Sequence, residues 1–444
     1  MKTFQGEKIA RWYVLYAVFL FSAQGVVALL GASALIIPDL PSPIPYEYGR
    51  SIHLALANFW PLIGTMGMVY YFTVQELKSE IYSLKIAKWE FYVVFLSTGG
   101  LFSTLALRIG NGREYLDGLP YFYAGISFAI ALGTYNLLRT LWKGKKNLTP
   151  ASVVMTAGLV FLCILLIPNV LSIRNPVADE AVKFWVVHAW EEMAFELTTS
   201  GFVASFFIAS HLAEKKDMEK WLYLEAGLAV SGGLFGTGHH YYWIGFPSVW
   251  LIIGTVFSLI QMIPVFLLAY LTYKGLKKRR PMDRREKLTV GLILSSMFYH
   301  ITGASLLGLL ITVPWINLYM HGTYITSGHA HFALFGALGF LVLAGAYYIL
   351  SEGNEPNKKA YLLGLFGVLQ LNVGLVIMGT SLLIAGFLQT YLGRVLEIDF
   401  IQIKTIVSPY LIIRVLGGLV FTLGDMLLSW RIFKTWWETR AIKS

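Results

Sequence analysis

The stretch HGTYITSGHAHFALFGALGFLVLAGAYYIL (321–350) decides the fold. It contains no Asp, Glu, Lys or Arg, and it exceeds the roughly 20 residues that a helix needs to cross a bilayer. It also holds His329 and His331, and histidine inside a membrane span is costly and usually functional. The stretch therefore predicts a transmembrane helix that carries part of a functional site.

The rest of the chain shares this apolar character. Of its 444 residues, 56% are hydrophobic and 14% charged, against about 45–50% and about 25% in soluble domains. The mean hydropathy of the chain is +0.63, and this value excludes a soluble multidomain protein. We expect an all-α integral membrane protein, a single domain (1–444) in which twelve helices form one bundle. The expected spans are 12–37, 51–75, 88–109, 119–142, 150–172, 179–211, 219–243, 247–273, 287–313, 322–350, 359–390 and 406–433.

The basic residues predict the orientation. The net charge is +10, but Lys and Arg gather in short gaps between apolar runs, and KGLKKRRPMDRREK (274–287) alone holds eight. Positive residues favour the cytoplasmic side, which places both termini in the cytoplasm. The charge thus reflects orientation in a membrane, and no nucleic-acid partner is expected. A lone cysteine, Cys163, excludes an intrachain disulfide framework and a covalently attached haem c.

Six of the nine histidines reach a similar depth, toward the outer face, in this topology. Packing histidines scattered through the core would not align in this way. His211 and His321 lie near membrane boundaries and carry no functional expectation, and His300 stands alone in mid-span as a packing or supporting residue. The six aligned histidines are His53, His188, His239, His240, His329 and His331.

His329 and His331 point in opposite directions. Two residues along a helix correspond to a rotation of about 200°, so these two imidazoles cannot bind one metal ion. Each can bind a different cofactor, one on either side of the helix.

A second group predicts a metal site. His188 and Glu192 are four residues apart and share a helix face, which Glu196 extends by one turn. His239 and His240 lie at a helix end, where frayed geometry can aim both inward. Three imidazoles and a carboxylate suit iron or zinc better than copper(I). Two carboxylates in an apolar helix are costly unless they are ligated or protonated.

Three segments carry a family resemblance. HAWEEMAFE (188–196), GTGHHYYWIG (236–245) and HGTYITSGHAHFALFGA (321–337) resemble the large, catalytic subunit of bacterial respiratory nitric oxide reductase, in the haem–copper oxidase superfamily. The resemblance covers nearly the whole chain, with the motifs in order. It implies an enzyme of the denitrifying respiratory chain that reduces two molecules of nitric oxide, with two electrons and two protons, to nitrous oxide and water.

The resemblance also assigns the cofactor ligands. It implies that His53 and His331 bind haem b and that His329 binds haem b3. Glu196 matches a second glutamate near the active site, with a catalytic role as proton donor or orienting group. The residues implied for the non-haem iron FeB are His188, His239, His240 and Glu192, the last also catalytic.

On the outer side, the segment GREYLDG (112–118) matches acids that lie near haem propionates in the family. Glu114, with Asp117, is therefore expected near a calcium ion and a proton entry route. Arg414 lies about two turns into the last span. It either pairs with a haem propionate or extends its side chain to the outer interface.

One position departs from the family pattern. The family usually has a glutamate 22 residues after the first histidine of the pair, and Gln261 stands there. Glutamine has the same shape but cannot titrate. The departure keeps open a divergent member that resembles the proposed nitric oxide dismutases.

Two alternative functions have signatures of their own. A haem–copper terminal oxidase commonly has a cross-linked tyrosine four residues after the first metal histidine, where this chain has Glu192. A multi-span transporter often shows two similar halves and a midplane site, neither of which is evident.

The electron donor is expected on a separate chain. Since no covalent haem c can attach here, we expect a membrane-anchored cytochrome c subunit, or another donor such as quinol.

Overall fold

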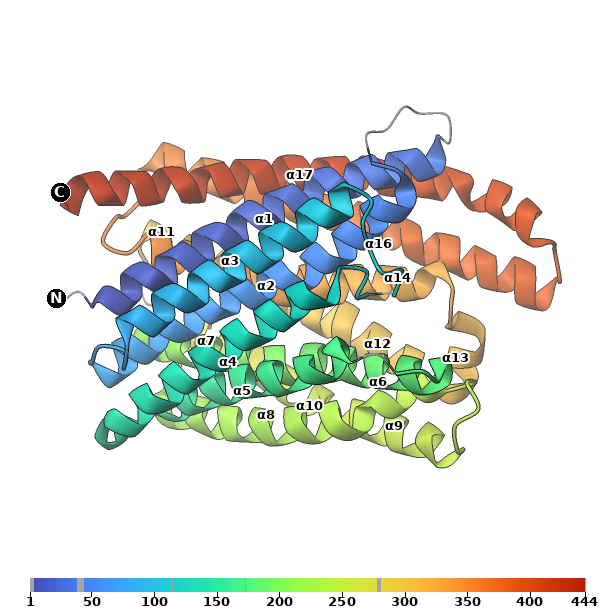
Figure 1. Ribbon diagram of the computed structural model, residues 1–444. Coiled ribbons are helices and arrows are strands. Elements are labelled where there is room, and N and C mark those ends of the chain that lie inside the picture. The colour runs from blue at the N-terminus through green and yellow to red at the C-terminus, as the bar shows by residue number, and fades with distance from the viewer. Residues whose placement is uncertain (1–3, 38–43, 114, 172, 278–280, 444) are drawn as a thin grey trace. The chain divides into compact units, whose positions relative to one another are not determined.

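The computed structural model describes residues 4–37, 44–113, 115–171, 173–277 and 281–443 (Figure 1). Every regular element in these ranges is an α-, 3-10 or π-helix, and none is a strand. The expectation of an all-α protein is confirmed for this part of the chain.

Among the described residues, nine helices are long and apolar enough to cross a membrane. The remaining expected spans, 88–109, 179–211 and 219–243, are also largely helical, but each carries carboxylates such as Glu90 and Glu225, which lower its hydropathy. The twelve spans and the cytoplasmic termini stay predictions. The nine helices are Gln5–Ile36, Tyr46–Leu77, Pro120–Lys143, Pro150–Pro168, Val249–Lys277, Arg284–Thr312, Tyr324–Leu350, Lys358–Val395 and Phe400–Thr439.

Contacts divide the chain into two compact units. The first comprises Met1–Ala17, Asn58–Tyr241 and Val256–Pro281, and the second Val18–Ala57, Tyr242–Thr255 and Met282–Ser444. Helices α1 (Gln5–Ile36), α2 (Tyr46–Leu77) and α9 (Val249–Ile260) contribute residues to both. The single domain over 1–444 stays a prediction.

The first unit contains His188, His239 and His240. Its helices are α3 (Leu84–Ala106), α4 (Pro120–Lys143), η1 (Lys145–Asn147), α5 (Pro150–Val170), α6 (Pro176–Ala189), η2 (Trp190–Phe195), α7 (Glu196–Ala209), α8 (Lys215–Phe235), η3 (Gly236–Tyr241) and α10 (Met262–Lys277). A capping box begins α5, since the Thr149 hydroxyl accepts from the Ser152 amide and the Ser152 hydroxyl from the Thr149 amide.

The second unit holds the uncharged stretch 321–350. Its helices are α11 (Arg284–Tyr299), η4 (His300–Leu306), α12 (Leu307–Thr312), α13 (Pro314–Met320), α14 (Tyr324–Ala330), η5 (His331–Gly339), α15 (Phe340–Leu350), α16 (Lys358–Thr390), η6 (Tyr391–Val395) and α17 (Phe400–Lys443). A capping box of Asp283 and Glu286 begins α11 directly after the basic loop.

The described residues contain four π-helical segments, and three of them interrupt the α-helices beside histidines and acids. Segment η2 lies between His188 and Glu196, η4 begins at His300, and η5 begins at His331. A π-turn leaves backbone carbonyls outside the regular α-helical bonding pattern, and such turns are frequent at functional sites. The sequence pattern did not predict them.

Glycine allows α16 and α17 to pack backbone against backbone (Figure 1). A Cβ atom at Gly374 would lie 2.7 Å from the carbonyl oxygen of Gly417 and 2.7 Å from the Cα of Phe421, closer than real Cβ atoms approach. Gly367 and Gly424 make the same kind of contact two turns away. Small residues of this kind commonly let membrane helices approach closely.

We expect Gly374→Ala to destabilise the second unit. The added methyl group would push the two backbones apart, and such overpacking typically costs about 1–3 kcal/mol. The matched control is Gly291→Ala on α11, where a Cβ would meet no atom within 4 Å, so higher helix propensity should stabilise by up to about 1 kcal/mol. Thermal unfolding of the detergent-solubilised variants measures both effects, and equal shifts would contradict the packing argument.

Candidate functional site

Three imidazoles meet inside the first unit. His188 comes from α6, and His239 and His240 come from η3, with one ligand nitrogen of each within 4.8 Å of the other two. The tight 3-10 turn after α8 lets two successive residues join one group. Gly236 provides the room, because a Cβ there would lie 3.2 Å from the His188 Nε2.

The hydrogen bonds of His188 determine which nitrogen is available to a metal ion. Its Nε2 lies 3.3 Å from the carbonyl oxygen of Gly232, and because a carbonyl only accepts, Nε2 carries the proton. The other ring nitrogen, Nδ1, is buried and faces Glu192. It lies 3.3 Å from the Glu192 carboxylate. Either a proton on Nδ1 or a metal ion can join these two atoms, and the donor set of three imidazoles and a carboxylate fits a metal ion.

The other two rings are held by neighbouring side chains. The Ser258 hydroxyl on α9 lies 3.0 Å from the His239 Nδ1, and Phe184 stacks on His240 with ring centroids 5.4 Å apart. Such partners fix the ring orientation and the tautomer of metal-binding histidines. The sequence pattern revealed neither residue, although Ser258 stands three residues before Gln261, on the same face of an apolar segment.

The two glutamates lie differently. Glu192 adjoins the histidine group through His188, whereas Glu196 begins α7 beyond the π-helical turn η2. The described group whose ligand atoms all lie within 4.8 Å consists of the three histidines. The structure therefore places Glu192 against the group through His188.

Gln261 bonds to the backbone next to the site. Its Nε2 donates to the carbonyl oxygen of Glu192 at a distance of 3.2 Å. Its side chain fills the space over Gly232, where a Cβ atom would overlap it. An ionised glutamate could not donate this hydrogen bond. The departure from the family pattern thus has a local structural role in supporting η2.

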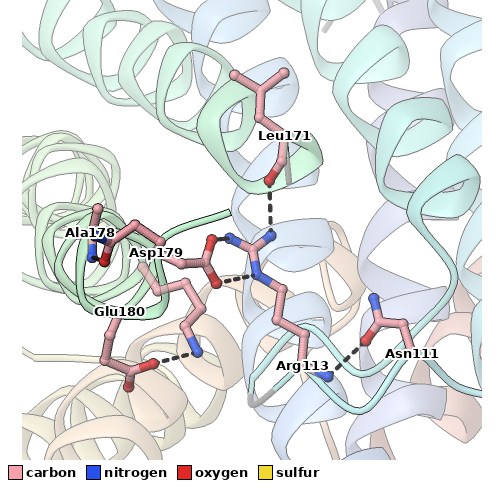
Figure 2. Close-up of polar contacts among 8 residues, drawn as sticks. Asn111, Arg113, Leu171, Ala178, Asp179 and Glu180 are labelled. Atoms are coloured by element: carbon pink, nitrogen blue, oxygen red, sulfur yellow. Dashed lines mark hydrogen bonds and ion pairs between the residues drawn. The ribbon is translucent and has the colours of Figure 1, made fainter. Parts of the chain in front are cut away.

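The loop between α3 and α4 is held by an ion pair. Figure 2 shows that the Arg113 guanidinium binds the Asp179 carboxylate at the start of α6, with an Nε–Oδ2 distance of 3.0 Å, and also donates to the Leu171 carbonyl. This bidentate pair fixes the loop against the helix that carries His188. Glu114, expected near calcium, lies outside the described residues. The described contact of Asp117 is through its backbone carbonyl, which accepts from Asn111.

The second unit contains a cavity with an empty volume of about 490 Å³. His53 and His331 both line it, with ring centroids 6.2 Å apart and ring planes inclined by 26°. Imidazole–metal bonds measure about 2 Å, so this separation accommodates one metal ion between the two rings. Gly25, Ala28 and Gly418 keep the walls open, and the aromatic and aliphatic lining suits a flat apolar macrocycle.

Backbone carbonyls orient the neighbouring histidines. The His331 Nδ1 donates to the Ser327 carbonyl at 2.7 Å, and the His329 Nδ1 donates to the Gly303 carbonyl at 2.9 Å. Each bond leaves the Nε2 lone pair for a metal ion. The ring of His53 is approached by the Gln24 amide at 3.5 Å.

The arginine predicted to pair with a haem propionate also lies at this cavity. Arg414 contributes to its wall together with His53 and His331. A guanidinium in an apolar, membrane-embedded cavity needs an anion, and a carboxylate substituent on the macrocycle would supply one. Elsewhere, the His321 carbonyl accepts from Arg394, and His211 adopts a φ of 54° in the turn after α7.

Comparisons with known proteins show the family and the fold of the chain. Residues 8–420 match the family model described as cytochrome c and quinol oxidase polypeptide I. A nitric oxide reductase subunit of Stutzerimonas stutzeri is 28% identical, covering 95% of this chain and 93% of that protein. A cytochrome c oxidase subunit 1 homologue of Azorhizobium caulinodans is 24% identical, covering 92% and 78%. A solved heme-copper terminal oxidase dimer superposes with a TM-score of 0.81 at 13% identity, covering 98% of this chain and 84% of that one, which shows the fold.

We expect Ser258→Ala to weaken metal binding at the three histidines about 10- to 100-fold, since His239 would lose the partner that orients its ring. Iron retained during dialysis against a graded chelator series measures this effect. Ser231→Ala serves as the control, because that hydroxyl bonds to Leu228 within its own helix. Equal retention by both variants would refute an orienting role for Ser258.

Proposed function

Because the chain belongs to the family of cytochrome c and quinol oxidase polypeptide I, whose members are oxidoreductases that bind haem, we propose that it is the catalytic subunit of a nitric oxide reductase. The reaction joins two molecules of nitric oxide and consumes two electrons and two protons, giving nitrous oxide and water. The observation that carries this proposal is the Glu192 carboxylate beside the buried Nδ1 of His188, within the group of three histidines.

The donor set favours iron at this site. Carboxylate oxygen and imidazole nitrogen suit Fe(II), whereas copper(I) prefers softer ligands. The nitric oxide reductase relative also matches almost the full length of both chains. Under the proposal, His188, His239, His240 and Glu192 hold the non-haem iron FeB.

The haem assignments follow the same logic. His53 and His331 would hold haem b across the cavity, and His329 would hold haem b3 through the nitrogen opposite its Gly303 bond. When bound, these irons supply electron transfer and the binding of nitric oxide. The chain's own residues orient the ligands, and Arg414 would anchor a propionate. Glu196 would donate or orient protons, and Glu114 would contribute to a calcium site.

An apolar cavity with an empty volume of about 410 Å³ borders α6 within the first unit. Val186, Val187 and Trp190, which flank His188 in sequence, line it together with Leu116 and Leu166. A space of this character admits a small, weakly polar gas more readily than ions.

The proposed enzyme has a definite cellular setting. It would lie in the bacterial inner membrane with its haems toward the outer side and serve denitrifying respiration. Electrons would come from a membrane-anchored cytochrome c subunit or from another donor such as quinol.

A terminal oxidase is the second candidate, because relatives of similar extent carry oxidase names. The two activities need different metals at the histidine group. Copper with Glu192 as a nearby base would favour oxygen reduction, and iron would favour nitric oxide reduction.

Metal analysis of the purified protein tests the choice. We expect two haems b and one further iron per chain, little copper, and consumption of nitric oxide with a reduced donor. Inductively coupled plasma analysis, pyridine haemochrome spectra and a nitric oxide electrode provide the three measurements. Copper equal to half the haem, or no haem absorption, would overturn the proposal.

Glu192→Ala should remove the non-haem iron while both haems remain. Because the carboxylate is a proposed ligand, turnover should fall by more than the roughly 10- to 100-fold that loss of an outer hydrogen-bond partner costs. The readouts are the iron-to-haem ratio and nitric oxide consumption.

The matched control for this variant is Glu191→Gln, which changes the adjacent carboxylate and should keep the non-haem iron. Full turnover in Glu192→Ala, or equal iron loss in both variants, would show that Glu192 is not a specific ligand.

A further inference from the structure

A buried carboxylate lies behind one wall of the cavity in the second unit. Asp425 on α17 has no solvent-exposed surface. Its Oδ1 accepts from the Ser22 hydroxyl of α1 at 3.0 Å and from the Ser429 hydroxyl at 2.9 Å. Its Oδ2 is buried and has no hydrogen-bond partner among the described residues. An intramembrane acid that is only half satisfied is costly and points to a function.

The unbonded oxygen is directed toward the cavity wall. A Cβ atom at Gly25 would lie 3.3 Å from the Asp425 Oδ2 and 3.0 Å from the Thr422 side chain. Gly25 and Thr422 both line the cavity that contains His53 and His331. The carboxylate is therefore separated from the cavity by one layer of small side chains and bare backbone.

Helix α17 carries one charged residue in the cavity wall and another behind it. Arg414 lines it at one place, and Asp425 follows eleven residues later, about 16 Å along the helix axis. Asp425 and the guanidinium are thus too far apart to pair, and the carboxylate is instead held by the two serine hydroxyls.

Other groups on the packed helices leave Asp425 without a charged partner. Arg431, the next charged residue of α17, bonds the Thr435 hydroxyl. On α16, the neighbouring stretch offers the neutral amides of Gln370 and Asn372, and on α15 the titratable group nearest this level is Tyr347. Arg414 in the cavity wall stays cationic in either redox state, so a charge change in the cavity acts on the protonation of Asp425.

We propose that Asp425 takes up one proton when one electron reduces ferric haem b in the adjoining cavity to the ferrous form, and releases it on reoxidation. The proposal rests on the proposed function, which places haem b there. A one-electron donor supplies the electron, and the carboxylate becomes a carboxylic acid. Reduction removes one positive charge, which disfavours a nearby anion in a low-dielectric setting and so favours the protonated acid.

The direction of the effect follows from this coupling. If reduction is accompanied by proton uptake, the midpoint potential of haem b falls as pH rises. Asp425→Asn is neutral at every pH and mimics the protonated acid. In this variant the midpoint potential of haem b should stay at the value that the native protein reaches at low pH, and it should not depend on pH.

The test is a spectroelectrochemical titration of haem b at a series of pH values, on the complete purified protein with mediators and dithionite. Reduced-minus-oxidised infrared spectra supply a second readout. We expect the native protein to gain a carboxylic C=O band on reduction that Asp425→Asn lacks. A flat potential in the native protein, or an unchanged slope and band in Asp425→Asn, would overturn the inference.

Further variants keep the test decisive if Asp425→Asn does not assemble. Ser22→Ala removes a hydrogen-bond donor to the carboxylate, which disfavours the ionised form. The pH range in which the haem b midpoint potential falls should therefore move to higher pH, and an unchanged range would count against the proposal. Thr422→Val is the matched control, since it alters the same wall and keeps the acid, and it should retain the slope. Absence of haem b would overturn the proposed function itself, whereas haem b with a flat potential overturns this inference alone.

Discussion

The close approach of the His188 Nδ1 and the Glu192 carboxylate, 3.3 Å apart in an apolar helix bundle, is the constraint that orders the site. The Gly232 carbonyl fixes the proton on the far nitrogen, so the near nitrogen and the carboxylate both present lone pairs. In water such a pair would be solvated, but inside a membrane each polar group needs a partner within the protein or a bound ion. A metal ion bound there would satisfy both atoms at once.

Much of the surrounding structure supports that contact. The π-helical turn η2 departs from the α-helical pattern between His188 and Glu196, and Gln261 donates to the backbone carbonyl of Glu192 within it. Gly232 has no side chain, so it leaves room for Gln261, and its carbonyl holds His188. A glutamine at this position therefore replaces a titratable group by a permanent donor, which stabilises the irregular turn at the expense of a possible proton carrier.

The sequence predicted those features of the fold that depend only on the periodicity and burial of its apolar residues. The apolar runs predicted helices that the structure contains, and the adjacency of His239 and His240 predicted an irregular helix end, which is the 3-10 turn η3. The π-turns were not predictable, because they depend on tertiary partners such as Gln261 rather than on local propensity. Ser258 and Phe184 were missed for a related reason. Their roles arise only when distant helices bring them against the histidine rings.

The cavity of the second unit extends the same reasoning to a larger group. Small residues such as Gly25 and Gly418 give it flat walls, and carbonyl acceptors set the tautomers of His329 and His331. A chain that only needed a packed core would fill this space, because voids forfeit dispersion contacts and cost stability. Keeping it open while lining it with Arg414 is favourable only if a large apolar group with an anionic edge completes the packing.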